Sequence, residues 1–292
     1  MSKKLPYLVL ILLLQSHPVL SDGNLQPGIE LFTQADYQQA TEYFYDIESD
    51  AGNEDNPEFL YYYGLSLYKT DQAKEALEAM SRAAEIEPQN PDYQYALTLI
   101  YLLRINEVNV FRKAGMFGKL KKAMATAADH EPTHLRGNMF YTGWLLYAPK
   151  MGGGDIEKGM VYLAKLKLVS EPDWVLMEAG LASRDEEYTR AEELYLKALE
   201  MKRSPSSVIN IARYYLAQKK YQQAISHANA FNLLPKHWAG PGNCDGHLVL
   251  AQAYHYLGDD AAFEEHSKKA IDMTNNKAQK ERFEASLNAL GD

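Results

Sequence analysis

Between Pro57 and Pro91, hydrophobic and polar positions alternate with the period of an α-helix in two successive stretches. The apolar and small positions of the first stretch share one helical face: Leu60, Tyr63, Gly64 and Leu67. Those of the second stretch do the same: Ala73, Ala76, Leu77, Met80, Ala83 and Ala84. The polar residues between them offer Thr70 or Asp71 as an N-cap, and Pro88 is expected to end the second helix. The pattern predicts a helical hairpin that must stack on neighbours to bury its faces.

The spacing of small residues in this hairpin recurs along the chain. Ala76 follows Gly64 by twelve residues. Four other pairs have the same separation: Gly28 and Ala40, Ala179 and Ala191, Ala212 and Ala224, and Ala251 and Phe263. Two units are longer than the others. In the first, the excess falls around residues 106–118, and Thr98 stands where Gly or Ala is expected; in the second, it falls in the loop 148–154. Inserted length of this kind is where a binding function is most often added.

This spacing resembles the tetratricopeptide repeat, whose unit of about 34 residues has small residues where its two helices cross and a proline at its end. The resemblance implies an all-α superhelical solenoid of about seven helical hairpins with a C-terminal capping helix. The expected segments are a signal peptide over 1–21, units near 22–54, 57–90, 91–132, 133–171, 172–204, 205–236 and 244–275, and a capping helix over 276–290.

The first residues have the pattern of a secretory signal peptide. Lys3 and Lys4 precede an apolar run over residues 5–14, which is too short to span a bilayer, and Val19 and Ser21 are small enough for a cleavage site. We therefore expect an exported protein, periplasmic or secreted, that begins near residue 22. No later segment is apolar enough to predict a membrane span.

The charge balance excludes some classes of partner. The formal net charge is −9, and it becomes about −11 without Lys3 and Lys4. Binding to nucleic acid or to an anionic membrane requires clustered Lys and Arg, so neither is an expected partner. The single cysteine, Cys244, cannot form an internal disulfide, so packing must hold the fold.

The sequence His130-Glu131-Pro132-Thr133-His134 matches the zinc-protease pattern H-E-x-x-H. That pattern needs both histidines one turn apart on a single helix, and the proline opposes such a helix. The repeat spacing places Pro132 at the end of a unit. We therefore interpret this stretch as a junction between repeats and expect no metal or other cofactor.

Glycines 152 to 154, followed by Asp155, could cradle a phosphate at a helix N-terminus, but the spacing of a P-loop is missing and Asp155 would repel an anion. An inter-helix turn with Asp155 as the N-cap is the preferred interpretation. This loop is similar to one in exported repeat proteins associated with TRAP-type solute transporters, although the chain lacks the lipoprotein cysteine of that group.

His237, Cys244 and His247 lie in a loop rich in Gly and Pro. They are three irregularly spaced residues, whereas zinc sites use closely paired ligands, so a structural loop is favoured. Catalysis by Cys244 would need a partner histidine that the sequence does not identify.

In the tetratricopeptide family the first helix of each unit lines an inner groove. Carrying those positions onto this chain gives a candidate partner-binding face of mostly apolar and aromatic side chains: Tyr61, Leu65, Tyr68, Tyr95, Leu99, Leu102, Ile209, Arg213, Leu216, Leu248, Gln252 and His255. Arg213 is the only Lys or Arg among them, which argues against a clamp for a C-terminal carboxylate. Either this face binds a peptide or an elongated apolar ligand, or another part of the chain covers it.

The sequence thus predicts a non-enzymatic scaffold or adaptor that binds another protein in the cell envelope. Two alternatives remain: an accessory protein that handles a ligand for a solute transporter, and a zinc-dependent hydrolase that uses His130, Glu131 and His134.

Overall fold

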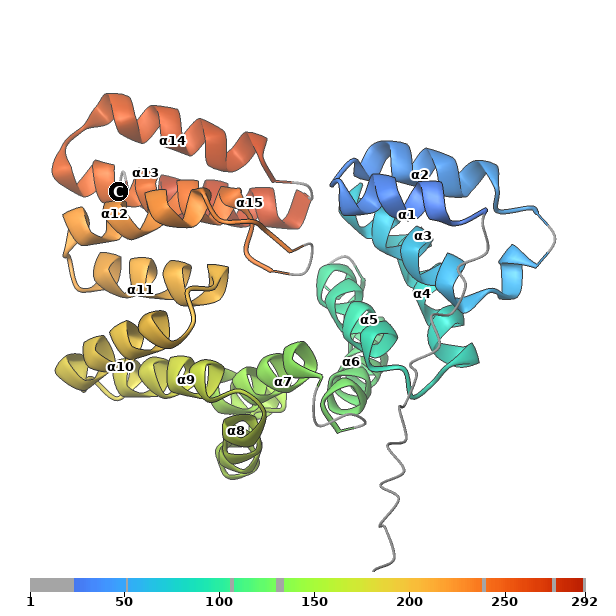
Figure 1. The fold of residues 1–292 in the computed structure, drawn as a ribbon, viewed down its shortest axis with the longest axis horizontal. Helices are drawn as coiled ribbons and strands as arrows, with labels where there is room; N and C mark the ends of the chain where they lie inside the picture. The colour runs from blue at the N-terminus through green and yellow to red at the C-terminus, as the bar shows by residue number, and fades with distance from the viewer. Residues whose placement is uncertain are drawn as a thin grey trace, which may run out of the picture.

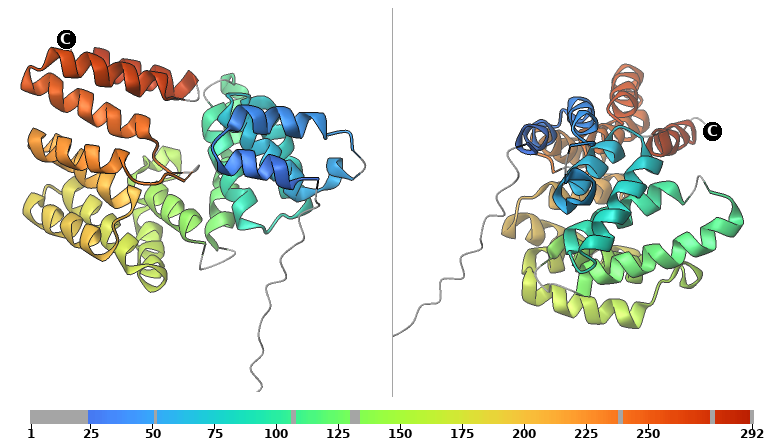
Figure 2. Two further views of the ribbon diagram at one scale, coloured as in Figure 1. Left: turned by 45° about the horizontal axis from the view of Figure 1, so that its top comes forward. Right: turned by 90° about the vertical axis from the view of Figure 1, so that its right-hand side faces the viewer.

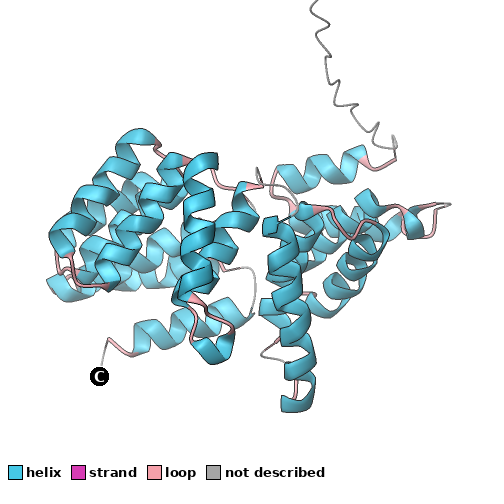
Figure 3. Cartoon of the chain, turned by 90° about the horizontal axis from the view of Figure 1, so that it is seen from below, coloured by secondary structure: helices cyan, strands magenta, loops and turns pink. Residues whose placement is uncertain are grey.

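The computed structural model describes residues 24–50, 52–105, 108–129, 134–237, 240–274 and 277–290. These residues form fifteen α-helices and two short 3-10 helices, and the described part of the chain contains no strand (Figures 1 and 3). The expected all-α fold class is confirmed. The signal-peptide prediction concerns residues 1–21, which lie outside the described residues.

The helices of the N-terminal half are α1 (Gln26–Thr33), α2 (Tyr37–Asp46), η1 (Asn53–Asp55), α3 (Pro57–Lys69), α4 (Ala73–Ile86), α5 (Pro91–Arg104), α6 (Val110–Asp129), α7 (Leu135–Tyr147), η2 (Lys150–Gly152) and α8 (Ile156–Val169). Those of the C-terminal half are α9 (Glu171–Arg184), α10 (Tyr188–Met201), α11 (Pro205–Ala217), α12 (Tyr221–Asn232), α13 (Asn243–Leu257), α14 (Asp260–Asp272) and α15 (Lys277–Asn288).

Consecutive helices from α1 to α14 pack in antiparallel pairs, which gives seven hairpins stacked side by side. The stack curves, so that the C-terminal hairpins turn back toward the N-terminal ones (Figures 1 and 2). Helix α15 packs against α13 and α14 and covers the end of the stack. This arrangement confirms the expected superhelix with a capping helix.

The turn inside the hairpin has the same backbone geometry in five of the seven hairpins. One residue of the turn has a left-handed backbone: it is the second residue after the helix at Ala35, Asp71, Glu186 and Lys219, and the first at Gly258. The next residue donates its N–H to the carbonyl five positions back, as in Gln72 to Leu67 at 2.9 Å and Lys220 to Tyr215 at 2.8 Å. This Schellman-type bond satisfies a carbonyl that the helix end would leave without a partner.

The predicted N-cap of α4 is wrong. Gln72 occupies that position without a side-chain capping bond, because Asp71 is needed for the left-handed turn. Thr70 instead donates its hydroxyl to the Ser66 carbonyl at 2.9 Å. The C-terminal end of the helix is as predicted, since α4 ends at Ile86, two residues before Pro88.

Small residues permit the close crossing of the paired helices. A Cβ added to Gly64 would lie 3.2 Å from the Met80 side chain, and one added to Gly28 would lie 2.6 Å from the ring of Phe44. Met80 and Phe44 are both fully buried. A larger side chain at either glycine would therefore separate the two helices of its hairpin or displace a core side chain.

Most of the extra residues of the longest unit lie in a helix. Helix α6 is 20 residues long and begins at Val110, within the stretch where the sequence predicts the excess. Thr98, which replaces the expected small residue, is fully buried, and its hydroxyl donates to the Gln94 carbonyl at 2.9 Å. The hydroxyl thus finds a partner within its own helix, and the substitution is tolerated in the core.

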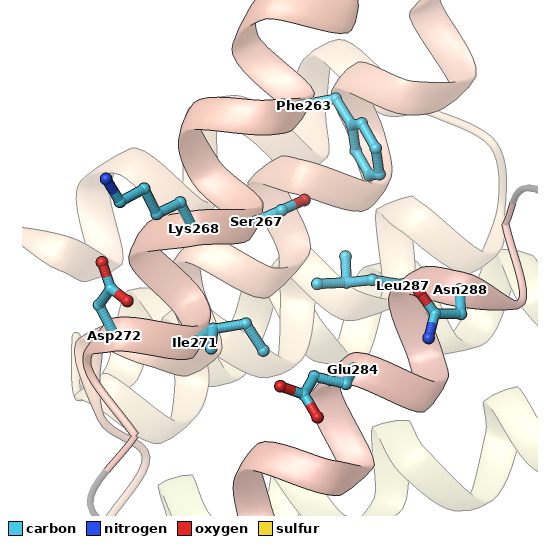
Figure 4. Close-up of a pocket in the computed structure, with 8 residues that line it drawn as sticks. All are labelled: Phe263, Ser267, Lys268, Ile271, Asp272, Glu284, Leu287 and Asn288. Carbon is cyan, nitrogen blue, oxygen red and sulfur yellow. The ribbon is translucent and has the colours of Figure 1, made fainter.

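The packing of the cap is incomplete. A cavity of about 330 Å³ lies between α14 and α15, and the side chains of Phe263, Ile271 and Leu287 face it (Figure 4). Ser267 lines the same cavity, and its buried Oγ has no hydrogen-bond partner. Ser267 holds the repeat position that Met80 fills in the second hairpin, so the cavity reflects a side chain that is too short for its place.

We expect Gly258→Ala to lower the free energy of unfolding by about 1 kcal/mol, because a Cβ is strained in the left-handed region. No atom lies within 4 Å of a Cβ added to Gly258, so the change isolates the backbone effect. The matched control is Gly118→Ala in α6, which also meets no atom within 4 Å but should stabilise the helix. Urea denaturation measures both variants, and effects of the same sign would contradict this account of the turn.

We expect Ser267→Met to raise the free energy of unfolding by about 1 kcal/mol, because it fills the cavity and removes an unpaired hydroxyl. Ser66→Met is the control, because Ser66 is fully buried and donates to the Tyr62 carbonyl at 2.8 Å. Overpacking there should cost about 1–3 kcal/mol. Thermal unfolding distinguishes the two, and a loss of stability in Ser267→Met would show that the cavity is not available to a larger side chain.

Candidate functional site

Aromatic side chains join the first helices of three consecutive hairpins, α3, α5 and α7. The ring of Tyr61 lies 5.0 Å from that of Tyr93, and the ring of Tyr95 lies 6.1 Å from that of Phe140. We call these four residues the aromatic row. Tyr61 is half-buried, whereas Tyr95 is 7% exposed. The row therefore belongs partly to the packing between hairpins and partly to the surface.

Burial changes the chemistry of these tyrosines. It raises the pKa of Tyr95 to about 12, and it raises the pKa of Tyr61 further, with the carboxylate of Asp92 adding to the effect. Tyr68, on the same helix as Tyr61, also has a pKa raised by burial. All three hydroxyls therefore stay protonated at neutral pH and can donate hydrogen bonds.

The other predicted inner-face residues divide into two groups. Leu65 is 1% exposed and lies in the core, while Leu99 and Leu102 are half-buried on α5. In the C-terminal half, Arg213 forms an ion pair with Asp245 at 2.8 Å, and the ring of His255 lies 5.3 Å from that of Phe263. Arg213 thus ties α11 to the first turn of α13. Within the described residues, neither the ion pair of Arg213 nor the ring contacts of His255 reach the aromatic row, so the structure gathers only the N-terminal members of the predicted set.

A polar pair beside the aromatic row was not foreseen from the sequence. His134 Nε2 lies 3.2 Å from Asp92 Oδ1, and His134 Nδ1 accepts the backbone N–H of Gly137 at 3.2 Å. Because Nδ1 accepts, Nε2 carries the proton and donates it to the carboxylate. This hydrogen bond lowers the pKa of Asp92, and burial opposes the shift. The one sequence signal for this pair was the position of His134 directly before the helical pattern that became α7.

The same geometry bears on the zinc-protease pattern. Helix α6 ends at Asp129 and α7 begins at Leu135, so the pattern falls at the connection between two helices. His130, Glu131, Pro132 and Thr133 lie outside the described residues. Both ring nitrogens of His134 are already engaged, which leaves this histidine no lone pair for a metal ion.

Cys244, which the sequence predicted in a loop, lies in the first turn of α13, and its thiol is not activated for catalysis. Cys244 is buried, and burial raises the pKa of its thiol to about 11. Its sulfur accepts a bond from Gln279 Nε2 at 3.5 Å. His247 is bonded to His266 instead, with 3.0 Å between their Nδ1 atoms. Within the described ranges, no three His, Cys, Asp or Glu side chains are grouped as metal ligands.

The glycine-rich loop before α8 is held by contacts of its own. Asp155 accepts the N–H of Lys158 at 3.0 Å, which confirms the predicted N-cap. Trp144 donates its indole N–H to the Gly152 carbonyl at 3.0 Å. A Cβ on Gly154 would lie 1.8 Å from the Ala148 oxygen, so this glycine is required by the close approach of two backbone segments.

The C-terminal part of the chain meets the N-terminal part near the aromatic row. The backbone N–H of Lys277, at the start of α15, donates to Asp71 Oδ2 at 3.3 Å. His237, in the loop after α12, has its pKa lowered by burial and then by Arg136, with Asp92 opposing and Lys69 adding to the decrease. This loop therefore lies close to the C-terminal end of α3 and to the first turns of α5 and α7, a position that the sequence did not predict.

None of the described helices has the length and apolar character needed to cross a membrane.

Comparisons with known proteins agree with this architecture. Residues 31–100 match the tetratricopeptide repeat family, and no curated protein sequence matches the chain. A tetratricopeptide repeat protein from Parabacteroides merdae ATCC 43184 has a similar structure, with a TM-score of 0.59, 16% identity, and coverage of 92% of this chain and 98% of that chain.

Two larger proteins are similar over part of their length. The APC/C hetero-tetramer Cut9-Hcn1 has a TM-score of 0.54 at 15% identity, covering 93% of this chain and 50% of that chain. The human IFIT1 dimer with PPP-AAAA has a TM-score of 0.53 at 18% identity, covering 88% of this chain and 61% of that chain. At these identities the structural likeness establishes the fold. The chain thus has a superhelical fold like that of tetratricopeptide repeat proteins, and its residues 31–100 match the tetratricopeptide repeat family in sequence.

Proposed function

We propose that this protein is a non-enzymatic, exported scaffold that binds another protein of the cell envelope. The proposed binding face is the face of α3, α5 and α7 that carries the aromatic row. The observation that carries the proposal is the aromatic row, in which Tyr61 meets Tyr93 and Tyr95 meets Phe140 across successive hairpins. Tyrosines provide a large apolar contact area with a polar tip at a low cost in conformational entropy.

The rigidity of the row supports this role. Its rings contact one another in two pairs, Tyr61 with Tyr93 and Tyr95 with Phe140, and Tyr95 also stands edge-on to His134 with 5.9 Å between ring centroids. The bond between His134 and Asp92 fixes α7 against α5. A partner would thus meet side chains that are already held in place, so binding orders few protein groups.

The proposed location rests on the sequence pattern of residues 1–21, with its two lysines, short apolar run and small residues. The net charge of −9 disfavours nucleic acid and anionic membranes as partners. A protein or peptide partner in the periplasm or outside the cell is the proposal that fits these features.

One alternative has an observation in its favour. The hydrogen bond from Lys277 to Asp71 joins the C-terminal part of the chain to the end of α3, and a contact of this kind favours an accessory protein that handles a small ligand for a transporter. The zinc hydrolase is disfavoured because both nitrogens of His134 are engaged.

Site-specific photo-crosslinking tests the proposed face. A photoreactive phenylalanine analogue at Tyr61 or Tyr68 should capture one specific envelope protein, because both side chains are half-buried at the inner face. The same analogue at Tyr188, which is exposed on α10, is the control and should not capture it. Capture from Tyr188 alone, or equally from all three positions, would contradict the proposal.

A further inference from the structure

A groove of about 1100 Å³ lies on the outer side of the second hairpin, between α2, η1, α3 and α4. Its floor comes from Leu60, Tyr63 and Leu67 of α3, which are only 7%, 8% and 3% exposed, so the floor offers the edges of these side chains rather than their whole apolar faces. Ala79 of α4 lines one wall, and Tyr45 of α2, which is 67% exposed, stands at the edge. The groove has the volume of a site that accepts several side chains of a peptide.

The groove lies on a different face of α3 from the candidate inner face. With 3.6 residues per turn, Leu60, Tyr63 and Leu67 share one side of the helix, while Tyr61 and Tyr68 project roughly 80–160° away from them. One helix therefore contributes to two separate surfaces. A ligand in the outer groove does not need the aromatic row.

Carboxylates surround this apolar floor. Asp46, Glu48, Glu54 and Glu85 line the groove, and in the described part of the chain none of their carboxylates lies within ion-pair distance of a basic side chain. Two further acids, Glu75 and Glu78, each lie near Lys74, at 4.0 Å and 3.7 Å. The rim is therefore negative, beyond the charge that Lys74 compensates.

Among the described residues that line the groove, the single basic one already forms an ion pair. Arg82 forms an ion pair with Asp55 and donates through Nε to the Glu54 carbonyl at 2.9 Å. Asp55 is thus its ion-pair partner, and the carboxylates of Glu54 and Glu85 add to the raised pKa of Arg82 at longer range, so the rim still carries a net negative charge. The carboxylate of Glu48 also contributes, after burial, to the raised pKa of Tyr63 on the floor, which places this negative charge close to the apolar surface.

We propose that this outer groove binds a basic, amphipathic segment of a partner protein. Apolar side chains of the segment would cover Leu60, Tyr63 and Ala79, and its Lys or Arg side chains would pair with the rim carboxylates. Charge complementarity selects this occupant over an acidic or purely apolar segment. The inference deepens the proposed scaffold function by naming the chemistry of a partner, and it uses a surface that the inner-face proposal does not.

The test uses the purified full chain and a fluorescent synthetic peptide of Leu and Lys, with Leu at the i, i+3, i+4 and i+7 positions of a helix. Fluorescence anisotropy should show binding that weakens as salt is added. Glu48→Lys combined with Glu85→Lys should weaken binding by about tenfold, because two attractive charges become repulsive. Both side chains are exposed, so the fold should not change.

The matched control is Glu193→Lys combined with Glu200→Lys. These residues are exposed on α10, and the change in net charge is the same. This control double variant should bind the Leu and Lys peptide with an affinity within about twofold of that of the unaltered protein, since exposed charges beyond the Debye length are screened. Equal weakening by the two double variants would mean general attraction to an acidic protein and would overturn the groove as the site.

A further variant tests occupancy of the groove. Ala79→Trp fills it from a half-buried wall position, and it should weaken the Leu and Lys peptide at least as much as the charge reversal does. An unchanged affinity in Ala79→Trp, no binding by the unaltered protein, or equal binding of a Leu and Glu peptide would each overturn the proposal. Photo-crosslinking at Tyr61 is unaffected by these variants, so failure of the groove and failure of the inner face can be told apart.

Discussion

The close crossing of two helices within each hairpin is the constraint on which the rest of this structure depends. Gly64 lies so near Met80 that a Cβ there would be at 3.2 Å, and the turn at Asp71 uses a left-handed backbone to bring the second helix back. The same turn recurs at Lys219 and Gly258. Five of the seven hairpins share this turn, and the rotations between successive hairpins add up to the curvature seen in Figure 1.

That curvature bears on one of the two candidate surfaces. On the inner side it brings the first helices of successive hairpins together, so that Tyr61 meets Tyr93 and Tyr95 meets Phe140. The second surface, the groove, lies between α2, η1, α3 and α4. Two different faces of α3 thus suit an adaptor that holds two parts of a partner, or two partners. Fold alone does not fix which partners these are.

The sequence predicted the repeated hairpins well, because helical periodicity and small-residue spacing are local properties. It was wrong about the cap of α4, since a left-handed residue such as Asp71 carries no clear sequence mark when it is not glycine. It also missed the pair of Asp92 with His134, and the approach of Lys277 to Asp71. Those contacts join residues far apart in the chain and depend on the summed rotation of several hairpins, which a local pattern does not encode.

The central claim is that the superhelix curves far enough for its capping helix to meet the end of α3. The most direct measurement is oxidative crosslinking of a protein with Asp71→Cys and Lys277→Cys, with Cys244 replaced by serine. The 3.3 Å bond between Asp71 Oδ2 and the Lys277 N–H predicts rapid formation of an intramolecular disulfide. Two thiols that stay reduced and reactive under oxidising conditions would contradict the account.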